Sequence, residues 1–136
     1  MRIGVVIVTH YRLGEEFLQA LRLIVPSAPP FLAVGIEPTQ SVEEMRRTIA
    51  QALTQAEQGQ GVLVLTDMFG GTPSNISLSF LADHKVEVVT GVNLPMLIKL
   101  ATLSEDKPLE ELASFIKSYG QRNISVASEI LPDENP

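Results

Sequence analysis

Hydrophobic positions along the chain follow two patterns. Four short apolar runs are rich in valine, isoleucine and leucine and are nearly continuous, which is typical of parallel strands covered on both faces. These runs lie at residues 2–8, 31–37, 61–66 and 85–90. The segments between them repeat apolar residues at helical spacing. This alternation predicts a doubly wound α/β fold, in which helices cover both faces of a mostly parallel sheet.

Capping signals predict where two of the helices begin. Ser41 followed by Glu44 forms a capping box, in which each side chain satisfies a free backbone N–H at the start of a helix. Thr72 followed by Pro73 suits a later helix, with the threonine hydroxyl as N-cap and proline at the first helical position. Both predictions depend on local sequence alone.

The C-terminal half is expected to contain two more helices and a last strand. Asn93 is placed to cap a short fourth helix, and a fifth helix over about residues 108–119 is expected to stop at Gly120. The final apolar run, residues 123–131, alternates more than the others, as an edge strand does. We therefore expect sheet order 2-1-3-4 plus an antiparallel C-terminal edge strand. One domain then covers residues 1–131, followed by a polar tail at 132–136.

Composition removes several classes of function. The 136 residues include no cysteine, which argues against a disulfide framework and a thiolate metal site. The net charge is −6 and the basic residues are scattered, so nucleic acid is an unexpected partner. The chain has no apolar run of membrane-spanning length and no secretion-signal pattern at its start. These features predict a cytoplasmic protein.

His10 and Asp67 are the candidate reacting groups. In an open α/β sheet, ligands bind beyond the carboxyl ends of the strands where the winding direction reverses, which for this order lies between strands one and three. His10 stands at the end of the first strand and Asp67 follows the third. A neutral imidazole is a nucleophile near physiological pH, and a carboxylate on one ring nitrogen fixes its tautomer. The topology therefore predicts that these two side chains meet.

The residues after Asp67 are candidates for binding a phosphoryl group. Gly70 and Gly71 allow the backbone to approach an anion closely, and Thr72 begins a helix whose dipole favours phosphate. Taken singly, these features have simpler interpretations: a structural histidine, a turn aspartate and a glycine turn. His84 is interpreted as a solvent-exposed surface residue, and no metal site is expected.

Three segments then resemble a known family, the mannose-family EIIA components of the bacterial phosphoenolpyruvate-dependent sugar phosphotransferase system (PTS). They are VIVTH at 6–10, DMFGGTPSN at 67–75 and GVNLPML at 91–97, and the resemblance extends from residue 1 to about 130. It implies a phosphotransferase in which His10 accepts a phosphoryl group from phospho-HPr and passes it to a histidine or cysteine of an EIIB partner. Asp67 is then the supporting carboxylate and Thr72 supplies a hydroxyl on the phosphate side, with no metal or cofactor.

The resemblance also implies partners. It predicts a homodimer formed by exchange of the C-terminal strand, residues 123–131. A separate EIIB protein would be the acceptor, and contact with the membrane would be indirect, through EIIC and EIID components that set the sugar specificity. One departure concerns docking: many members have glycine directly after the histidine, whereas this chain has Tyr11 and Arg12.

Three alternatives remain open from the sequence. The protein could be the phosphoryl-donor subunit that serves dihydroxyacetone kinase, which shares the fold and the N-terminal histidine. It could be a regulatory phosphoacceptor without a transport role. A flavodoxin-like module that binds a nucleotide or flavin is the non-enzymatic alternative, and at the predicted site only Tyr11 and Phe69 are available to stack on such a ligand.

Overall fold

The computed structural model describes residues 2–82 and 85–132. His84 and residues 133–136 of the predicted tail lie outside the described residues. In chain order the elements are β1 (Gly4–His10), α1 (Leu13–Ile24), β2 (Leu32–Ile36), α2 (Val42–Ala56), β3 (Val62–Thr66), α3 (Thr72–Leu78), β4 (Val86–Thr90), α4 (Leu94–Thr102), α5 (Leu109–Arg122) and α6 (Ala127–Ile130). Within these ranges no helix has the length and apolar character needed to cross a membrane.

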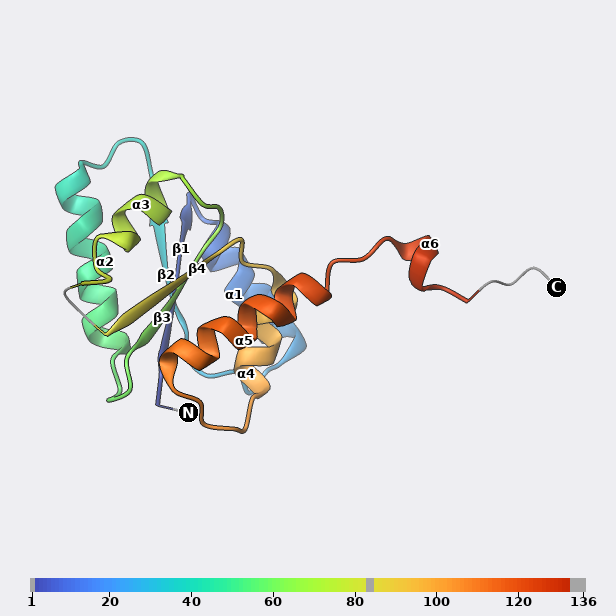
Figure 1. Cartoon of the computed structure of the whole chain (residues 1–136). Coiled ribbons are helices and arrows are strands. Elements are labelled where there is room, and N and C mark those ends of the chain that lie inside the picture. Colours follow the sequence, from blue (N-terminus) through green and yellow to red (C-terminus); the bar gives the residue numbers. More distant parts are fainter. Residues whose placement is uncertain (1, 83–84, 133–136) are drawn as a thin grey trace.

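The four strands form one parallel sheet in the order β2-β1-β3-β4, which confirms the predicted fold class (Figure 1). Helices α2 and α3 cover one face, and α1, α4 and α5 cover the other (Figure 1). Successive side chains of β1 serve opposite cores, since Val6 and Val8 pack with α2 and α3 whereas Val5 and Ile7 pack with the other helices. Burial on both faces explains the continuous apolar runs.

The predicted side-chain caps at Ser41 and Asn93 are confirmed, although at Ser41 the structure gives only the serine half of the predicted capping box. Ser41 Oγ accepts a hydrogen bond from the Glu44 N–H at 3.1 Å, and Asn93 Oδ1 accepts one from the Met96 N–H at 3.1 Å. Each bond satisfies a backbone donor that the first turn of a helix leaves free.

Two other predicted helix boundaries were wrong, and each of them involves a glycine. Gly71, not Thr72, is the N-cap of α3, so Thr72 is already helical. Helix α5 does not stop at Gly120 but continues to Arg122. Gly120 is buried against α4, where an added Cβ would stand 2.6 Å from Met96 Cγ. This glycine permits close packing of two helices and does not end one.

The antiparallel edge strand predicted at residues 123–131 is not observed within the chain. After α5 the chain leaves the body of the molecule and forms the short helix α6 (Figure 1). Ile124 and Ile130 on this C-terminal arm are 74% and 67% exposed. A strand needs a neighbour for its backbone hydrogen bonds, and α5 carries the arm away from the edge of the sheet. The sheet of the described residues therefore ends at β4.

Candidate functional site

The sheet brings His10 and Asp67 into contact, as the predicted topology requires. His10 is the last residue of β1, and Asp67 directly follows β3, the neighbouring strand. His10 Nδ1 lies 2.8 Å from Asp67 Oδ2. The side chain of His10 is 45% exposed, whereas that of Asp67 is 12% exposed. A half-exposed imidazole is thus paired with a shielded carboxylate at the carboxyl edge of the sheet.

Backbone donors hold the Asp67 carboxylate in place. The His10 backbone N–H donates to Oδ2 at 3.0 Å, and the Met68 N–H donates to Oδ1 at 3.1 Å. Burial by itself would raise the pKa of Asp67. The hydrogen bonds that Asp67 accepts from His10, together with the positive charge that the His10 ring can carry, outweigh this effect, so the pKa of Asp67 lies below its usual value. Asp67 is therefore ionised and can only accept from the ring, which places the imidazole proton on Nδ1. In the neutral form of the ring the lone pair of Nε2 is then free.

Gly71 packs against the reactive edge of the imidazole. A Cβ at this position would stand 2.9 Å from His10 Cε1 and 3.4 Å from Nε2. Its φ of −83° is ordinary for any residue, so the need for glycine here comes from space. Gly70 differs, because its φ of +86° lies in the left-handed region that glycine adopts most readily. The loop therefore turns at Gly70 and passes the ring at Gly71.

Thr72 lies exposed at the first position of α3, and its hydroxyl makes no capping hydrogen bond. The hydroxyl therefore does not cap the start of α3. Among the three residues predicted to bind phosphate, Gly71 is the one placed against the ring, while Gly70 shapes the turn before it.

The conformation of Tyr11 was missed by the sequence analysis. Tyr11 follows His10 directly and has φ +49°, and it is the one non-glycine residue with positive φ in the described part of the chain. Its N–H donates to the Ile36 carbonyl at 2.9 Å. Its carbonyl oxygen packs so closely on Gly35 of β2 that a Cβ there would collide with it. No local sequence signal links Tyr11 to Gly35, because the contact exists only once β1 and β2 pair.

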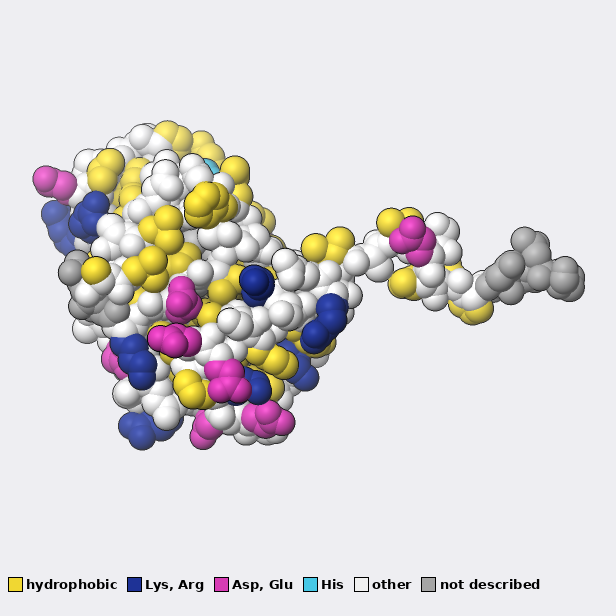
Figure 2. All heavy atoms as spheres, viewed as in Figure 1, with side chains coloured by type: hydrophobic (Ala, Val, Ile, Leu, Met, Phe, Trp, Pro, Cys, Tyr) yellow, Lys and Arg dark blue, Asp and Glu magenta, His cyan; other side chains and the backbone are white. Residues whose placement is uncertain are grey.

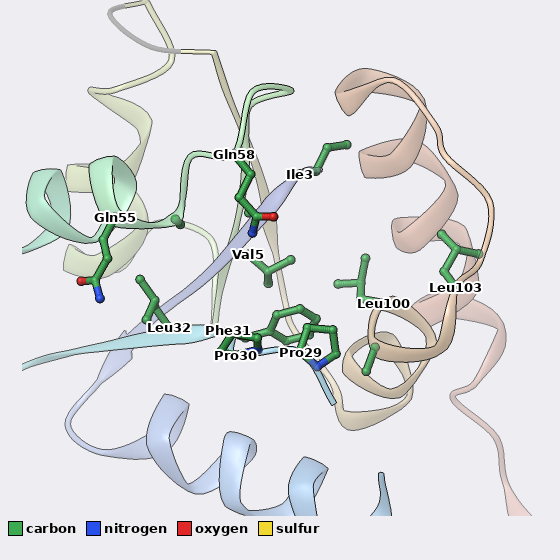
Figure 3. Close-up of a pocket in the computed structure, with 13 residues that line it drawn as sticks. Ile3, Val5, Pro29, Pro30, Phe31, Leu32, Gln55, Gln58, Leu100 and Leu103 are labelled. Carbon is green, nitrogen blue, oxygen red and sulfur yellow. The ribbon is translucent and has the colours of Figure 1, made fainter. Parts of the chain in front are cut away.

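A separate pocket lies at the other end of the sheet. It has a volume of about 400 Å³ and is lined mainly by apolar side chains from the amino ends of β1 and β2 and from α4, among them Val5, Phe31 and Leu100 (Figure 3). His10 is five residues beyond Val5 on β1, roughly 16 Å away at about 3.3 Å per residue. The pocket therefore takes no part in the chemistry of His10.

Comparison with known proteins decides the family. A sequence profile named EIIA-man, described as "PTS system fructose IIA component", matches residues 4–117. The chain belongs to this family. It is 31% identical over 130 residues to the fructose-specific EIIA component of the PTS of Bacillus subtilis (strain 168), covering 95% of this chain and 89% of the relative.

Further relatives agree with this assignment. The sorbose-specific EIIA component of Lacticaseibacillus casei is 26% identical over 126 residues, covering 92% of this chain and 91% of the relative. Among solved structures, the mannose/sorbose-specific IIA subunit from Enterococcus faecalis superposes with a TM-score of 0.87 at 28% identity, covering 99% of this chain and 100% of the other. The protein is thus an EIIA component of the mannose family of the PTS, and the family implies a role as a phosphoryl carrier in sugar transport.

Proposed function

We propose that this EIIA component accepts a phosphoryl group from phospho-HPr on His10 Nε2 and passes it to a separate EIIB protein for sugar uptake. The observation that carries the proposal is the orientation of the imidazole in a member of this family. Nδ1 is bound to a shielded carboxylate, which leaves the exposed ring with a free Nε2 lone pair. On this proposal the protein works in the cytoplasm and meets the membrane only through its partners.

The reaction exchanges one phosphorus–nitrogen bond for another. The Nε2 lone pair attacks phosphorus in line, while the P–N bond of the phosphoryl donor breaks and its electron pair returns to the donor's imidazole. The positive charge that develops on the His10 ring is stabilised through its Nδ1–H by Asp67. Because the bond formed resembles the bond broken, the step is close to balanced and positioning supplies most of the catalysis.

Gly70, Gly71 and Thr72 would bind the phosphoryl oxygens on this proposal. The contact of Gly71 with the Cε1–Nε2 edge of the ring supports this assignment, because phosphorus would approach His10 at Nε2. The Thr72 hydroxyl makes no capping bond and is exposed, so it is available as a further hydrogen-bond donor. Such donors stabilise the charge that spreads over the phosphoryl oxygens in the transition state.

Phosphorylation in a purified system tests the assignment. The protein is incubated with phosphoenolpyruvate, Enzyme I and HPr, and any acid-labile phosphate is mapped by mass spectrometry. We expect one phosphate on His10, none in His10→Ala, and normal labelling in His84→Ala, which keeps the proposed acceptor. Label at another residue, or none, would refute the proposal. Onward transfer to the EIIB protein then separates a transport component from a purely regulatory acceptor.

We also propose that two copies pair by exchanging the C-terminal arm, residues 123–131. The free edge of β4 borders a groove of about 480 Å³ lined by Val88 and Thr90 of β4 and by Ala113 and Lys117 of α5, among others. The arm offers alternating apolar side chains, including Ile124 and Val126, that no neighbour covers in the single chain. Adding the partner's arm as a strand would satisfy the edge of β4 and bury these side chains.

Two truncations test the exchange by light scattering after size-exclusion chromatography. Ending the chain after Asn123, the C-cap of α5, removes all of the arm except its first residue and should give a monomer. Ending it after Leu131 removes only the tail and should leave the dimer intact. A dimer in the first variant, or a monomer in the full-length chain, would refute strand exchange.

A further inference from the structure

A free backbone N–H at the start of α1 is satisfied by the strand that precedes the helix. Arg12 is the N-cap of α1, but its side chain makes no capping hydrogen bond. Instead, Thr9 Oγ1 of β1 accepts a hydrogen bond from the Gly14 N–H at 2.8 Å. Gly14 is the second residue of α1, so its N–H is one of those that the first turn of a helix leaves free. The bond therefore joins β1 to α1 across the turn at residues 10–12.

This hydrogen bond, here called the Thr9–Gly14 clasp, is shielded from water. Thr9 is 0% exposed, and Gly14 is buried as well. The space between them is filled, since a Cβ at Gly14 would lie 3.3 Å from both Thr9 Oγ1 and Ile7 Cγ2. A hydrogen bond in such surroundings is stronger than one in water, and removing its acceptor leaves a buried donor unsatisfied. The clasp therefore fixes the two ends of the turn relative to each other.

His10 is the first residue of the turn that the clasp closes. Only residues 10–12 lie between Thr9 and the first residue of α1. Tyr11, in the middle of the turn, has φ +49°, and its N–H donates to the Ile36 carbonyl at 2.9 Å. A turn this short, held at both ends and in the middle, leaves the backbone of His10 little freedom.

The position of this backbone sets the orientation of the imidazole. Asp67 Oδ2 accepts a hydrogen bond from the His10 backbone N–H at 3.0 Å and also lies 2.8 Å from Nδ1 of the ring. One oxygen can serve both groups only when the backbone and the ring of His10 keep a fixed arrangement. The His10 side chain is 45% exposed, and part of the histidine is visible at the upper edge of the molecule in Figure 2. Packing alone therefore does not hold the ring, and a displaced turn would rotate it away from Asp67.

We propose that Thr9 is a positioning residue for phosphoryl transfer: its buried hydroxyl holds the turn that carries His10 and thereby keeps Nε2 in line with the incoming phosphorus. This inference rests on the proposed function. Successive side chains of a strand point to opposite faces, so Thr9 acts through the backbone and does not touch the reacting atoms. In-line transfer is sensitive to such positioning, since a misplacement near 1 Å costs about 10²-fold in rate. A helix cap that served stability alone would leave the transfer rate of the folded protein unchanged.

Substitutions at Thr9 separate positioning from stability. Thr9→Val keeps the shape of the side chain and removes the hydroxyl, whereas Thr9→Ser keeps the hydroxyl. Thr9→Ala is a second variant without the hydroxyl, and it places no methyl group against the Gly14 N–H. Ser41→Ala is the matched control, because it removes a side-chain hydrogen bond from the start of another helix, α2.

Single-turnover rates of His10 phosphorylation are measured over a range of phospho-HPr concentrations. We expect the saturating rate to fall about tenfold in Thr9→Val and Thr9→Ala, while the half-saturating concentration changes by less than about twofold. Thr9→Ser and Ser41→Ala should keep the saturating rate of the parent within about twofold.

Nitrogen-15 NMR of the imidazole, at a pH where the ring is neutral, shows which ring nitrogen carries the proton. We expect the proton on Nδ1 in the parent and a mixture of both tautomers in Thr9→Val and Thr9→Ala. Equal saturating rates in these variants and the parent would overturn the positioning role. A lower rate with unchanged ring nitrogen shifts, or an equal loss in Ser41→Ala, would also overturn it. Failure of phospho-HPr to label the parent protein would refute the proposed function and this inference together.

Discussion

Replacing Gly71 by alanine separates the geometry of the site from the stability of the fold. The new Cβ would lie 2.9 Å from His10 Cε1 and 3.4 Å from Nε2. The backbone at Gly71, with φ −83° and ψ 169°, accepts alanine without strain. A lower chain entropy of the unfolded state favours the variant by about 0.4–1 kcal/mol, and the weaker N-cap costs a similar amount. The free energy of unfolding should therefore change little.

The effect on transfer should be much larger. Carbon–carbon contacts are ordinarily at least about 3.5 Å, so the ring must retreat by about 0.6 Å or more from a Cβ at 2.9 Å. This movement disturbs the 2.8 Å bond between His10 Nδ1 and Asp67 Oδ2, and the methyl group also crowds the side of Nε2 that phosphorus must reach. A misplacement near 1 Å costs about 10²-fold in rate, and we expect a loss of about 10–10²-fold.

The assay measures the single-turnover rate of His10 phosphorylation together with the midpoint of urea unfolding. Gly91→Ala is the matched control, since a Cβ at Gly91 meets nothing within 4 Å but its φ is +84°. That variant should lose about 1–2 kcal/mol of stability through backbone strain and keep the parent rate. A Gly71→Ala protein that transfers phosphate at the parent rate would refute the proposed role of this contact.

Three further predictions test other parts of the structure. Asp67→Asn should retain the fold but slow phosphorylation by about 10–10³-fold, because it removes the charge that stabilises the imidazolium and turns one amide N–H toward a backbone donor. Equal phosphorylation rates for this variant and the parent would contradict the orienting role of Asp67. Hydrogen bonds from the Gly61 and Gly59 N–H groups lower the pKa of Glu57, so its contribution to stability is present above the unfolded value of about 4.5 and is lost as pH falls through the lower folded pKa. The urea midpoint of Glu57→Gln should therefore lie below that of the parent at pH 7 and approach it on acidification, whereas a constant difference would contradict this linkage. Gly35→Ala places a Cβ against the Tyr11 carbonyl oxygen and should cost about 1–3 kcal/mol, visible as a lower urea midpoint, and an unchanged midpoint would show that β2 relaxes freely.

The sequence by itself determined the architecture and the central contact of the site. Continuous apolar runs marked strands buried on both faces, and the side chains of Ser41 and Asn93 marked helix starts that their hydrogen bonds confirm. The expected strand order then placed His10 beside Asp67. These predictions hold because periodicity and capping are local properties, and because few topologies satisfy a parallel sheet with helical crossovers.

Only the tertiary structure decided the roles of the glycines. Gly71 makes room for an imidazole, Gly120 for a methionine and Gly35 for a backbone carbonyl. In the sequence Gly71 and Gly120 resemble turn or cap residues, and Gly35 is one residue of a predicted strand, because the neighbour that requires each missing side chain comes from another part of the chain. The left-handed conformation of Tyr11 belongs here too, because its two anchors, Gly35 and Ile36, both lie on β2.

The C-terminal arm shows the same division. Its alternating pattern indicates a tendency to form a strand, yet residues 127–130 are helical in the single chain. Helix capping is completed within a few neighbouring residues, whereas a strand becomes stable only against another strand. Sequence therefore determined what is satisfied locally or by the few topologies that a parallel sheet allows, and the tertiary arrangement decided the close contacts and strand pairing that depend on one particular distant neighbour.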